Sequence, residues 1–406
     1  MQDTEKREET TCCVVGGGPA GVMLALLLAR KGVEVTLLEE HMDFARDFRG
    51  DTVHPSTMEI LEQLGLAERL LQLEHTKARM LAFKTTQGNA MSFNFQRLNT
   101  RYPYITLIPQ ARFLEFLTQE ASHSPTFHLI MGARAEKLIE EDGYIHGIQY
   151  RARDGWHELR AVLTVGADGR FSRVRKLAGF EPVKTSAPMD VLWFRLPHET
   201  SDPQESGFVV GPGHFLVRLD RGEEWQFGYI IPKGGYQQVK AAGLAQFRQD
   251  IGKLMPGMAQ RTEHITEWKQ VSVLSVESSL IERWYKPGLL LIGDAAHVMT
   301  PIGGVGINYA IQDAVAAANI LTDNLQAGKV STADLARVQS RREPPTRRIQ
   351  AFQNRIQQQF LARVLSADQK LTIPWLGKLL LKMPVLQKRR AKMIAFGPRP
   401  ERVKNP

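Results

Sequence analysis

The chain lacks most features that would place a protein in a membrane or in an oxidising compartment. Its 406 residues include two cysteines, Cys12 and Cys13. Adjacent cysteines at the end of a buried strand cannot easily pair, and no C-x-x-C spacing exists, so we expect small core residues in a reducing cytoplasm. No run of 18 or more apolar residues occurs, so no transmembrane helix is expected. Residues 1–10 are mostly charged and polar, which predicts a frayed tail rather than a secretory signal.

The sequence also lacks an internal repeat, a low-complexity linker and an evident catalytic pair or triad. What remains is the composition of an ordinary globular protein, with 43% hydrophobic and 23% charged residues. The length is enough for a large core and about two domains. The chemistry therefore has to be sought in the glycine-rich loops.

The first glycine-rich loop follows an apolar strand and leads into an Ala/Leu-rich helix. Residues 16–21 read G-x-G-x-x-G, and a second strand, residues 33–38, ends in Glu39. This spacing is the fingerprint of a dinucleotide-binding βαβ unit, whose glycines make a tight turn, admit the pyrophosphate and allow close helix–strand packing. Glu39 suits the hydroxyls of an adenosine ribose, but the fingerprint alone does not separate NAD from FAD.

A second glycine-rich loop lies near residue 300. The apolar strand 289–292 runs into Gly293 and Asp294, and three glycines follow at residues 303–306, just before a helix. The positive N-terminus of a helix suits a flavin ring, which gains negative charge on reduction. Asp294 could accept a hydrogen bond from a sugar-alcohol hydroxyl. The alternatives are structural, because Asp294 could cap the next helix and Pro301 could merely stiffen the loop.

A third loop, residues 165–175, reads Val-Gly-Ala-Asp-Gly-Arg-Phe-Ser-Arg-Val-Arg. In their order along the chain, the three loops resemble the motifs of the single-component FAD-dependent aromatic hydroxylases, the para-hydroxybenzoate-hydroxylase-like flavoprotein monooxygenases. The resemblance runs from residue 12 to residue 321. Arg49 stands where that family places an arginine over the FAD pyrophosphate, and Gln110 where it has a glutamine near the flavin.

The resemblance implies FAD as the bound cofactor and NADH or NADPH as a transient reductant, since no second G-x-G-x-x-G provides a separate nicotinamide domain. Asp168 belongs to a motif that in the family touches both FAD and the nicotinamide nucleotide. No metal site is predicted. The implied cofactor-binding residues are Gly16, Gly18, Pro19, Ala20, Gly21, Glu39, Glu40, Arg49, Gln110, Asp168, Gly293, Asp294, Pro301, Gly304, Val305, Gly306 and Ile307.

The resemblance also implies a reaction. Reduced flavin would react with O₂ to give a C4a-hydroperoxide, which hydroxylates an aromatic or quinone-like small molecule. Because the cofactor carries the difficult chemistry, few catalytic side chains are needed. His54 could help to deprotonate a phenol, although a histidine before a proline more often starts a helix. The substrate is expected near Phe208, His214, Phe215, Arg218, Phe227 and Tyr229.

The predicted fold class is α/β, with a Rossmann-like discontinuous FAD-binding domain, an antiparallel β substrate domain and a helical basic C-terminal tail. Aromatic, β-branched strands with short turns predict the antiparallel sheet, and residues 80–95 predict a hairpin turning at Gly88 and Asn89. The FAD-binding domain takes residues 10–78, 106–185 and 280–330, the substrate domain takes residues 79–105 and 186–279, and the tail takes residues 331–406.

Positive charge is concentrated near the C-terminus. Residues 331–406 hold 17 Lys/Arg and 4 Asp/Glu, in a chain of net charge +9. Residues 373–383 combine a tryptophan with leucines on one helical face and flanking lysines. Such a helix could lie on an anionic membrane surface or pack on the flavin domain with its lysines solvated. No nucleic-acid partner is expected, because no aromatic-interleaved groove accompanies the charge. The predicted location is the cytoplasm, with or without peripheral membrane contact.

Other activities share these flavin motifs. One is the FAD-dependent reduction or dehydrogenation of an isoprenoid or polyketide. Halogenation is disfavoured, because residues 227–232 lack both tryptophans of the W-x-W-x-I-P motif of flavin-dependent halogenases. A non-enzymatic prenyl-binding carrier is disfavoured by the intact glycines, Glu39 and Asp294.

Overall fold

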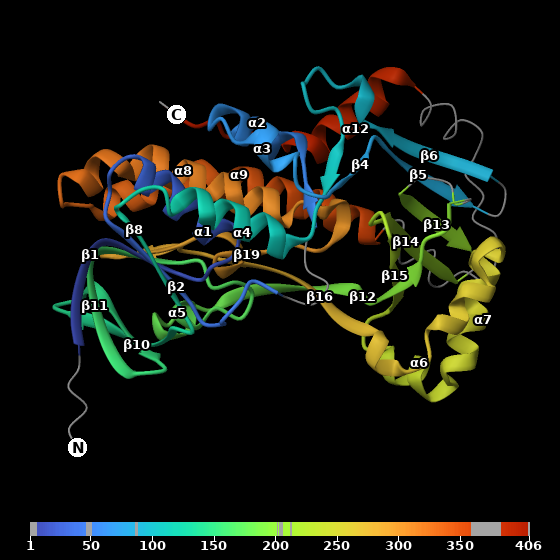
Figure 1. Ribbon diagram of the computed structural model, residues 1–406, viewed down its shortest axis with the longest axis horizontal. Coiled ribbons are helices and arrows are strands. Elements are labelled where there is room, and N and C mark those ends of the chain that lie inside the picture. Colours follow the sequence, from blue (N-terminus) through green and yellow to red (C-terminus); the bar gives the residue numbers. More distant parts are fainter. Residues whose placement is uncertain are drawn as a thin grey trace.

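The computed structural model of the chain describes residues 6–45, 51–85, 88–200, 202, 206–211, 213–358 and 383–404. Two large sheets form its framework, with a layer of long helices packed over one of them (Figure 1). Both chain ends of the described part lie at the side of the first sheet, away from the second sheet.

The first sheet has a parallel centre. Its strand order is β17-β18-β11-β1-β2-β8. In addition, β10 pairs antiparallel with β11, and β9 pairs antiparallel with β10. The pairs β18–β11, β11–β1, β1–β2 and β2–β8 are all parallel. The bounds are β1 Lys6–Val15, β2 Val35–Glu39, β8 Phe127–Met131, β9 Arg134–Glu141, β10 Tyr144–Ala152, β11 Gly155–Gly166, β17 Tyr285–Lys286 and β18 Leu289–Leu291.

The start of the chain differs from the sequence-based expectation of a frayed tail. Strand β1 already begins at Lys6, and the segment Lys6–Thr10, four of whose five residues are charged, pairs in register with His157–Ala161 of β11. The charged side chains are accommodated because this end of the sheet is open to solvent, where Arg7 lies 3.9 Å from Glu158. The prediction of a frayed tail was therefore wrong for the described residues of this segment.

Long helices cover the parallel sheet. Helix α1, Pro19–Arg30, packs against both α8, Gly306–Gln326, and α4, Gln110–Ala121. Helix α9, Thr332–Ile356, packs against α8 and also contacts the edge strand β17. Small alanines on α8, among them Ala310 and Ala314, are buried and let the helix approach closely. Cys12 and Cys13 are fully buried beneath this layer, as predicted, and burial raises the pKa of the Cys12 thiol to about 12.

The second sheet is mostly antiparallel, as the aromatic strands predict. Its order is β19-β16-β12-β15-β14-β13-β5-β6, in which only β13 and β5 pair in parallel. The bounds are β5 Met80–Thr85, β6 Gly88–Asn94, β12 Pro182–Pro197, β13 Gly207–Gly211, β14 His214–Asp220, β15 Glu224–Pro232, β16 Ser272–Ile281 and β19 His297–Val298. Strands β5 and β6 pair as predicted, but Gly88 and Asn89 are strand residues paired with Thr85 and Lys84, so the prediction of a turn at these two residues was wrong.

Shorter elements close the gaps between these layers. A small sheet joins β3 Thr52–Val53, β7 Ile105–Leu107 and β4 Thr76–Ala78. The remaining helices are α2 Pro55–Gln63, α3 Ala67–Leu70, α5 Arg173–Leu177, α6 Tyr236–Ala242, α7 Leu244–Leu254 and α12 Pro384–Phe396. Short 3₁₀ turns cover Phe95–Arg97, Pro256–Met258, Gln260–His264, Trp268–Gln270, Gly293–Ala295 and Ile302–Gly304.

The described part of the C-terminal region is helical in α9 and α12, and residues 397–404 are irregular. Helix α12 packs on β6 and α2 (Figure 1), and Glu401 binds back to α9 through Arg341 and Arg342. Residues 373–382, which carry most of the predicted membrane-surface helix, lie outside the described residues. Among the residues that are described, no helix is long and apolar enough to cross a membrane.

Candidate active site

A cavity of about 500 Å³ lies between the two sheets. Its lining comes from the glycine-rich turn after β1, the loop between β19 and α8, and the facing strands of the antiparallel sheet. The predicted cofactor residues that line it are Gly16, Gly18, Pro19, Ala20, Glu39, Glu40, Gln110, Asp168, Asp294, Pro301, Gly304, Val305, Gly306 and Ile307.

The glycines of the first loop are required by close backbone contacts. Gly16 has a φ of +108°, and a Cβ there would lie 2.6 Å from the carbonyl oxygen of Ala167. A Cβ on Gly21 would lie 2.0 Å from the carbonyl oxygen of Gly16, so only glycine allows α1 to start this close to β1. Gly18 differs, because the nearest atom to its Cβ would be the Ala167 oxygen at 3.9 Å. The turn therefore leaves free space beside Gly18.

Glu39 ends β2 next to this turn and is 6% exposed. One carboxylate oxygen accepts a 2.8 Å hydrogen bond from the backbone N–H of Gly17, and the other accepts one of 2.9 Å from the N–H of His41. These bonds fix the carboxylate at the cavity wall. The second oxygen also lies 2.7 Å from Nδ1 of the His41 ring, and Glu39 lines the cavity as a hydrogen-bond acceptor.

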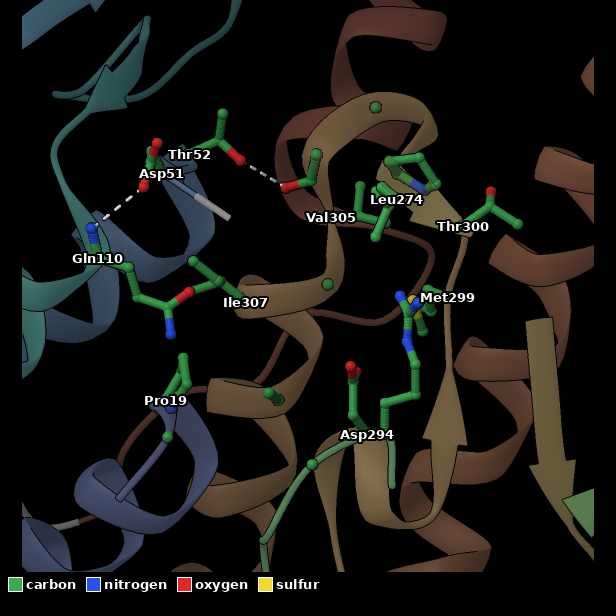
Figure 2. A pocket seen from close by; sticks show the side chains of 18 of the residues that line it. Pro19, Asp51, Thr52, Gln110, Leu274, Asp294, Met299, Thr300, Val305 and Ile307 are labelled. Carbon is green, nitrogen blue, oxygen red and sulfur yellow. Dashed lines mark hydrogen bonds between the residues drawn. The ribbon is translucent and has the colours of Figure 1, made fainter. Parts of the chain in front are cut away.

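The second glycine-rich loop is pinned from outside by residues that follow Asp51. A Cβ on Gly304, whose φ is +62°, would lie 2.6 Å from Oγ1 of Thr52. That hydroxyl donates a 2.8 Å hydrogen bond to the Gly304 carbonyl (Figure 2), and the amide of Asn308 donates to the carbonyl of Thr52. Contacts between residues some 250 positions apart in the chain therefore hold the loop in shape.

Asp294 lies in the short turn Gly293–Ala295, and its side chain borders the same cavity as Gln110 and Ile307 (Figure 2). The turn is fixed from behind, because the N–H of Gly293 donates to Asp313 of α8 at 3.1 Å. Gly293 has a φ of +60° and, like Gly21, is not among the described lining residues. Both glycines shape the backbone beneath the cavity.

Asp168 organises its own loop. Its carboxylate accepts hydrogen bonds from the Ser172 hydroxyl and from the backbone N–H groups of Arg173 and Val174, at the start of α5. Burial raises the pKa of Asp168, an effect that these hydrogen bonds oppose. The side chain lines the cavity next to Arg170 and holds the loop at that edge.

The residues around Gln110 contain a group that sequence reasoning missed. Asp51 accepts a 3.1 Å hydrogen bond from the N–H of Gln110 (Figure 2) and forms an ion pair of 2.5 Å with Arg221. All three residues line the cavity. No local signal marks this pair, because 170 positions separate its members along the chain. Arg49 lies outside the described residues.

The residues present fit FAD. Helix α1 begins at Pro19 and helix α8 at Gly306, and no side chain of the described residues caps either N-terminus. Both helix N-termini border the cavity, so two positive helix ends with uncapped N–H groups lie at its wall. The first suits a pyrophosphate, and the second suits the edge of a flavin ring that gains negative charge on reduction.

The substrate side is lined by alternate residues of the antiparallel sheet. On β14 the lining residues are Phe215, Val217 and Leu219, and on β13 Phe208. Of the predicted substrate residues, Phe208 and Phe215 thus reach the cavity. His214, Arg218, Phe227 and Tyr229 are not among its described lining residues, because successive side chains of a strand point to opposite faces.

Those four residues instead belong to the far face of the sheet. Phe227 and Tyr229 pack in the core beneath α7. His214 is hydrogen-bonded to the Tyr229 hydroxyl, and Arg218 lies over the Trp225 ring at 4.6 Å. The structure therefore gives them packing roles away from the cavity.

His54 is also placed away from the cavity lining described here. It is 0% exposed, and its Nδ1 lies 2.9 Å from the carbonyl oxygen of Ile394 in α12. His54 stands at the start of α2, where its backbone N–H donates to the side-chain oxygen of Asn308 in α8. Burial lowers the pKa of His54 to about 4, so the ring is neutral at neutral pH. Its position supports the helix-start alternative and gives no support to a catalytic role.

The fold and the cavity together define a dinucleotide-binding flavoprotein with a separate substrate wall. The family model described as "FAD binding domain" matches residues 9–353. The chain belongs to this family, and within it to the FAD-dependent aromatic monooxygenases, which use NADH or NADPH as reductant and O₂ as co-substrate.

Individual relatives agree with this assignment. The chain is 34% identical to 6-methylpretetramide 4-monooxygenase of Streptomyces rimosus over 346 residues, which cover 83% of this chain and 82% of the relative. It is 31% identical to rifampicin monooxygenase of Streptomyces venezuelae, over 73% of this chain and 60% of that protein. The structure of p-nitrophenol 4-monooxygenase from Pseudomonas putida shares the fold, with a TM-score of 0.75, 20% identity and coverage of 97% and 100%.

Proposed function

We propose that this monooxygenase hydroxylates a flat, polycyclic phenol or quinone of the aromatic polyketide type. The observation that carries the proposal is the wide apolar wall opposite the flavin loops. Phe83 and Phe208 stack at a centroid distance of 4.2 Å, and Phe208 and Phe215 are 5.7 Å apart. A surface of aromatic rings suits a fused-ring substrate. The names of 6-methylpretetramide 4-monooxygenase and rifampicin monooxygenase support it.

Helices from the C-terminal region add to this wall. Ile349, Phe352 and Ile356 of α9 and Ile394 of α12 line the cavity as well. These apolar side chains extend the substrate half and exclude water from it. Exclusion of water favours transfer of oxygen to the substrate over its loss to solvent.

The geometry of the loops supports a role for each of the following cofactor residues. The backbone beside Gly18 would hold the FAD pyrophosphate, Glu39 the ribose and Asp294 the ribityl chain. The backbone of residues 304–307 would hold the flavin ring, with Gln110 beside it. When bound, FAD supplies hydride acceptance from the nicotinamide nucleotide and activation of O₂, while the protein positions the ring of the substrate.

A substrate panel tests the proposal. The FAD-loaded protein would be given NADH or NADPH with single-ring phenols, polycyclic phenols and quinones, and nucleotide oxidation and products would be measured. We expect polycyclic phenols to stimulate oxidation most and to give hydroxylated products. Stimulation by single-ring phenols alone would contradict the polycyclic assignment, and reduction of an alkene would indicate a reductase.

Two further assignments remain predictions. We infer the division into a discontinuous FAD-binding domain and a β-sheet substrate domain from the two sheets that face the cavity. The proposal that the basic C-terminal region contacts a membrane is based on its positive charge. Vesicle sedimentation tests this proposal. Binding to anionic but not to neutral vesicles, with loss of binding above about 0.5 M salt, would support it.

A further inference from the structure

One charged side chain stands in the apolar substrate wall. Arg221 lies in the turn between β14 and β15 and lines the cavity. Among the described lining residues of the antiparallel sheet and its turns, it is the single ionisable one. Its side chain is 11% exposed. A buried guanidinium in such a wall needs partners for all of its donors.

Two of the three nitrogens of this guanidinium have partners. Nη2 donates to Asp51 at 2.5 Å, and both Nη2 and Nε donate to the side-chain oxygen of Gln226, with the Nε bond at 2.8 Å. Nη1 is buried and has no hydrogen-bond partner among the described residues. The two partnered nitrogens fix the plane of the group, and the third is left with unused donors.

A second unused donor lies in the same wall. The indole Nε1 of Trp193, on β12, is buried without a hydrogen-bond partner among the described residues, and Trp193 lines the cavity. Guanidinium and indole N–H groups can only donate. A ligand that satisfies them must therefore bring acceptor oxygens, which phenolate and keto groups provide and plain hydrocarbon rings do not.

The location of Arg221 places such a contact next to the flavin loops. Asp51, its ion-pair partner, accepts from the N–H of Gln110, and the following residue, Thr52, holds the Gly304 carbonyl (Figure 2). An oxygen bound at Arg221 is thus held at the boundary between the apolar wall and the cofactor cradle. A ring carrying that oxygen would be oriented relative to the cradle.

We propose that Arg221 determines substrate specificity by donating from Nη1 to an acceptor oxygen, keto or ionised phenolic, of the aromatic substrate. Asp51 and Gln226 act as positioning residues that hold the guanidinium. The proposal rests on the proposed function, since its ligand is the aromatic substrate of that site. It involves binding and orientation, and no covalent step.

The test compares two flat probes of similar size. The FAD-loaded protein is titrated with 1,8-dihydroxyanthraquinone and with anthracene, and binding is followed by the flavin absorbance. For wild type we expect tighter binding of the quinone. Arg221→Met should weaken quinone binding about tenfold or more and leave anthracene binding within about twofold. Arg221→Lys, which keeps the charge near Asp51, should show a smaller loss of the same selectivity.

A matched control separates recognition from structure. Arg218→Lys alters an arginine of the adjacent strand β14 that lies over Trp225, and it should change neither affinity. Equal losses for both probes in Arg221→Met and Arg221→Lys would show a merely structural role and overturn the proposal. So would unchanged selectivity in both variants. Failure of wild type to bind either probe would instead contradict the proposed function.

Discussion

The two walls of the cavity are built in different ways. The cofactor wall is made of backbone. Tight turns bring Gly16 and Gly304 against neighbouring chain segments, and two helices without side-chain caps begin at the cavity. The substrate wall is made of side chains, which point to the cavity from alternate positions of β14 and β15. A backbone wall tolerates almost no change at tightly packed glycines such as Gly16 and Gly304, whereas a side-chain wall can be rebuilt one residue at a time.

This difference explains how one cofactor can serve many substrates. The cofactor wall binds a molecule that is the same throughout the family, so its geometry is fixed. The substrate wall lies on the other sheet, and a change on one strand face leaves the turns around Gly16 and Gly304 untouched. Substitutions in one wall are therefore expected to leave the function of the other wall largely unchanged.

The largest effect is expected for glycines of the cofactor wall. Gly16→Ala places a Cβ 2.6 Å from the Ala167 oxygen at a φ of +108° and should both unfold the turn and lower FAD affinity by about 100-fold or more. In Gly18→Ala the added Cβ has open space, so the melting temperature of the apoprotein should be unchanged while the affinity for FAD still falls. Calorimetry and FAD titration measure both. FAD binding of wild-type strength in Gly18→Ala would show that the pyrophosphate lies elsewhere.

Two phenylalanines on opposite faces of the second sheet sharpen the comparison. Phe227 is 0% exposed in the core beneath α7, so Phe227→Ala should lower the free energy of unfolding by about 3–5 kcal/mol. Phe215→Ala enlarges the cavity and should mainly raise the KM for a polycyclic substrate, with FAD retained. Denaturant unfolding and steady-state kinetics separate the two outcomes. If Phe227→Ala changed the KM more than Phe215→Ala does, the substrate would bind on the face of the sheet beneath α7, which contradicts this account.

Asp294 tests a single polar contact in the cofactor wall. Asp294→Ala should weaken FAD binding by about 10- to 100-fold, in line with loss of a hydrogen bond to a carboxylate. Asp294→Asn keeps one acceptor oxygen and should lose less. Fluorescence titration of the apoprotein with FAD gives both values. Equal affinities for wild type and Asp294→Ala would show that this carboxylate only shapes its turn.

The smallest effect on turnover is expected for His54. In the native protein its pKa is lowered to about 4 from 6.5, so the stability that its neutral burial provides is present above pH 6.5 and is lost as the pH falls toward 4. His54→Asn can still donate to Ile394 and does not titrate, so its unfolding free energy should fall less steeply across that range, by up to about 1.4 kcal/mol per pH unit. The kcat should change less than about twofold, whereas loss of a general base would lower it at least about 100-fold.

The sequence predicted the cofactor wall better than the substrate wall, for a physical reason. Turns such as residues 16–21 are local, and their glycine spacing is set by the backbone itself. Arg221 and Asp51 meet only because two distant segments fold together, and no spacing marks them. On β14 and β15 the sequence suggested residues of both faces, because burial against α7 and burial against a ligand both favour aromatic residues. The strand Lys6–Thr10 was missed since its charged residues pair at an open end of the sheet.

Oxygen-isotope labelling tests the central claim most directly. The FAD-loaded protein is supplied with NADH or NADPH, ¹⁸O₂ and the polycyclic phenol that best stimulates nucleotide oxidation. The mass of the product is then measured by mass spectrometry. We predict a product that contains one atom of ¹⁸O and is formed only in the presence of substrate, nucleotide and oxygen. A product without label, or one that has gained two hydrogens, would contradict assignment of this site to hydroxylation.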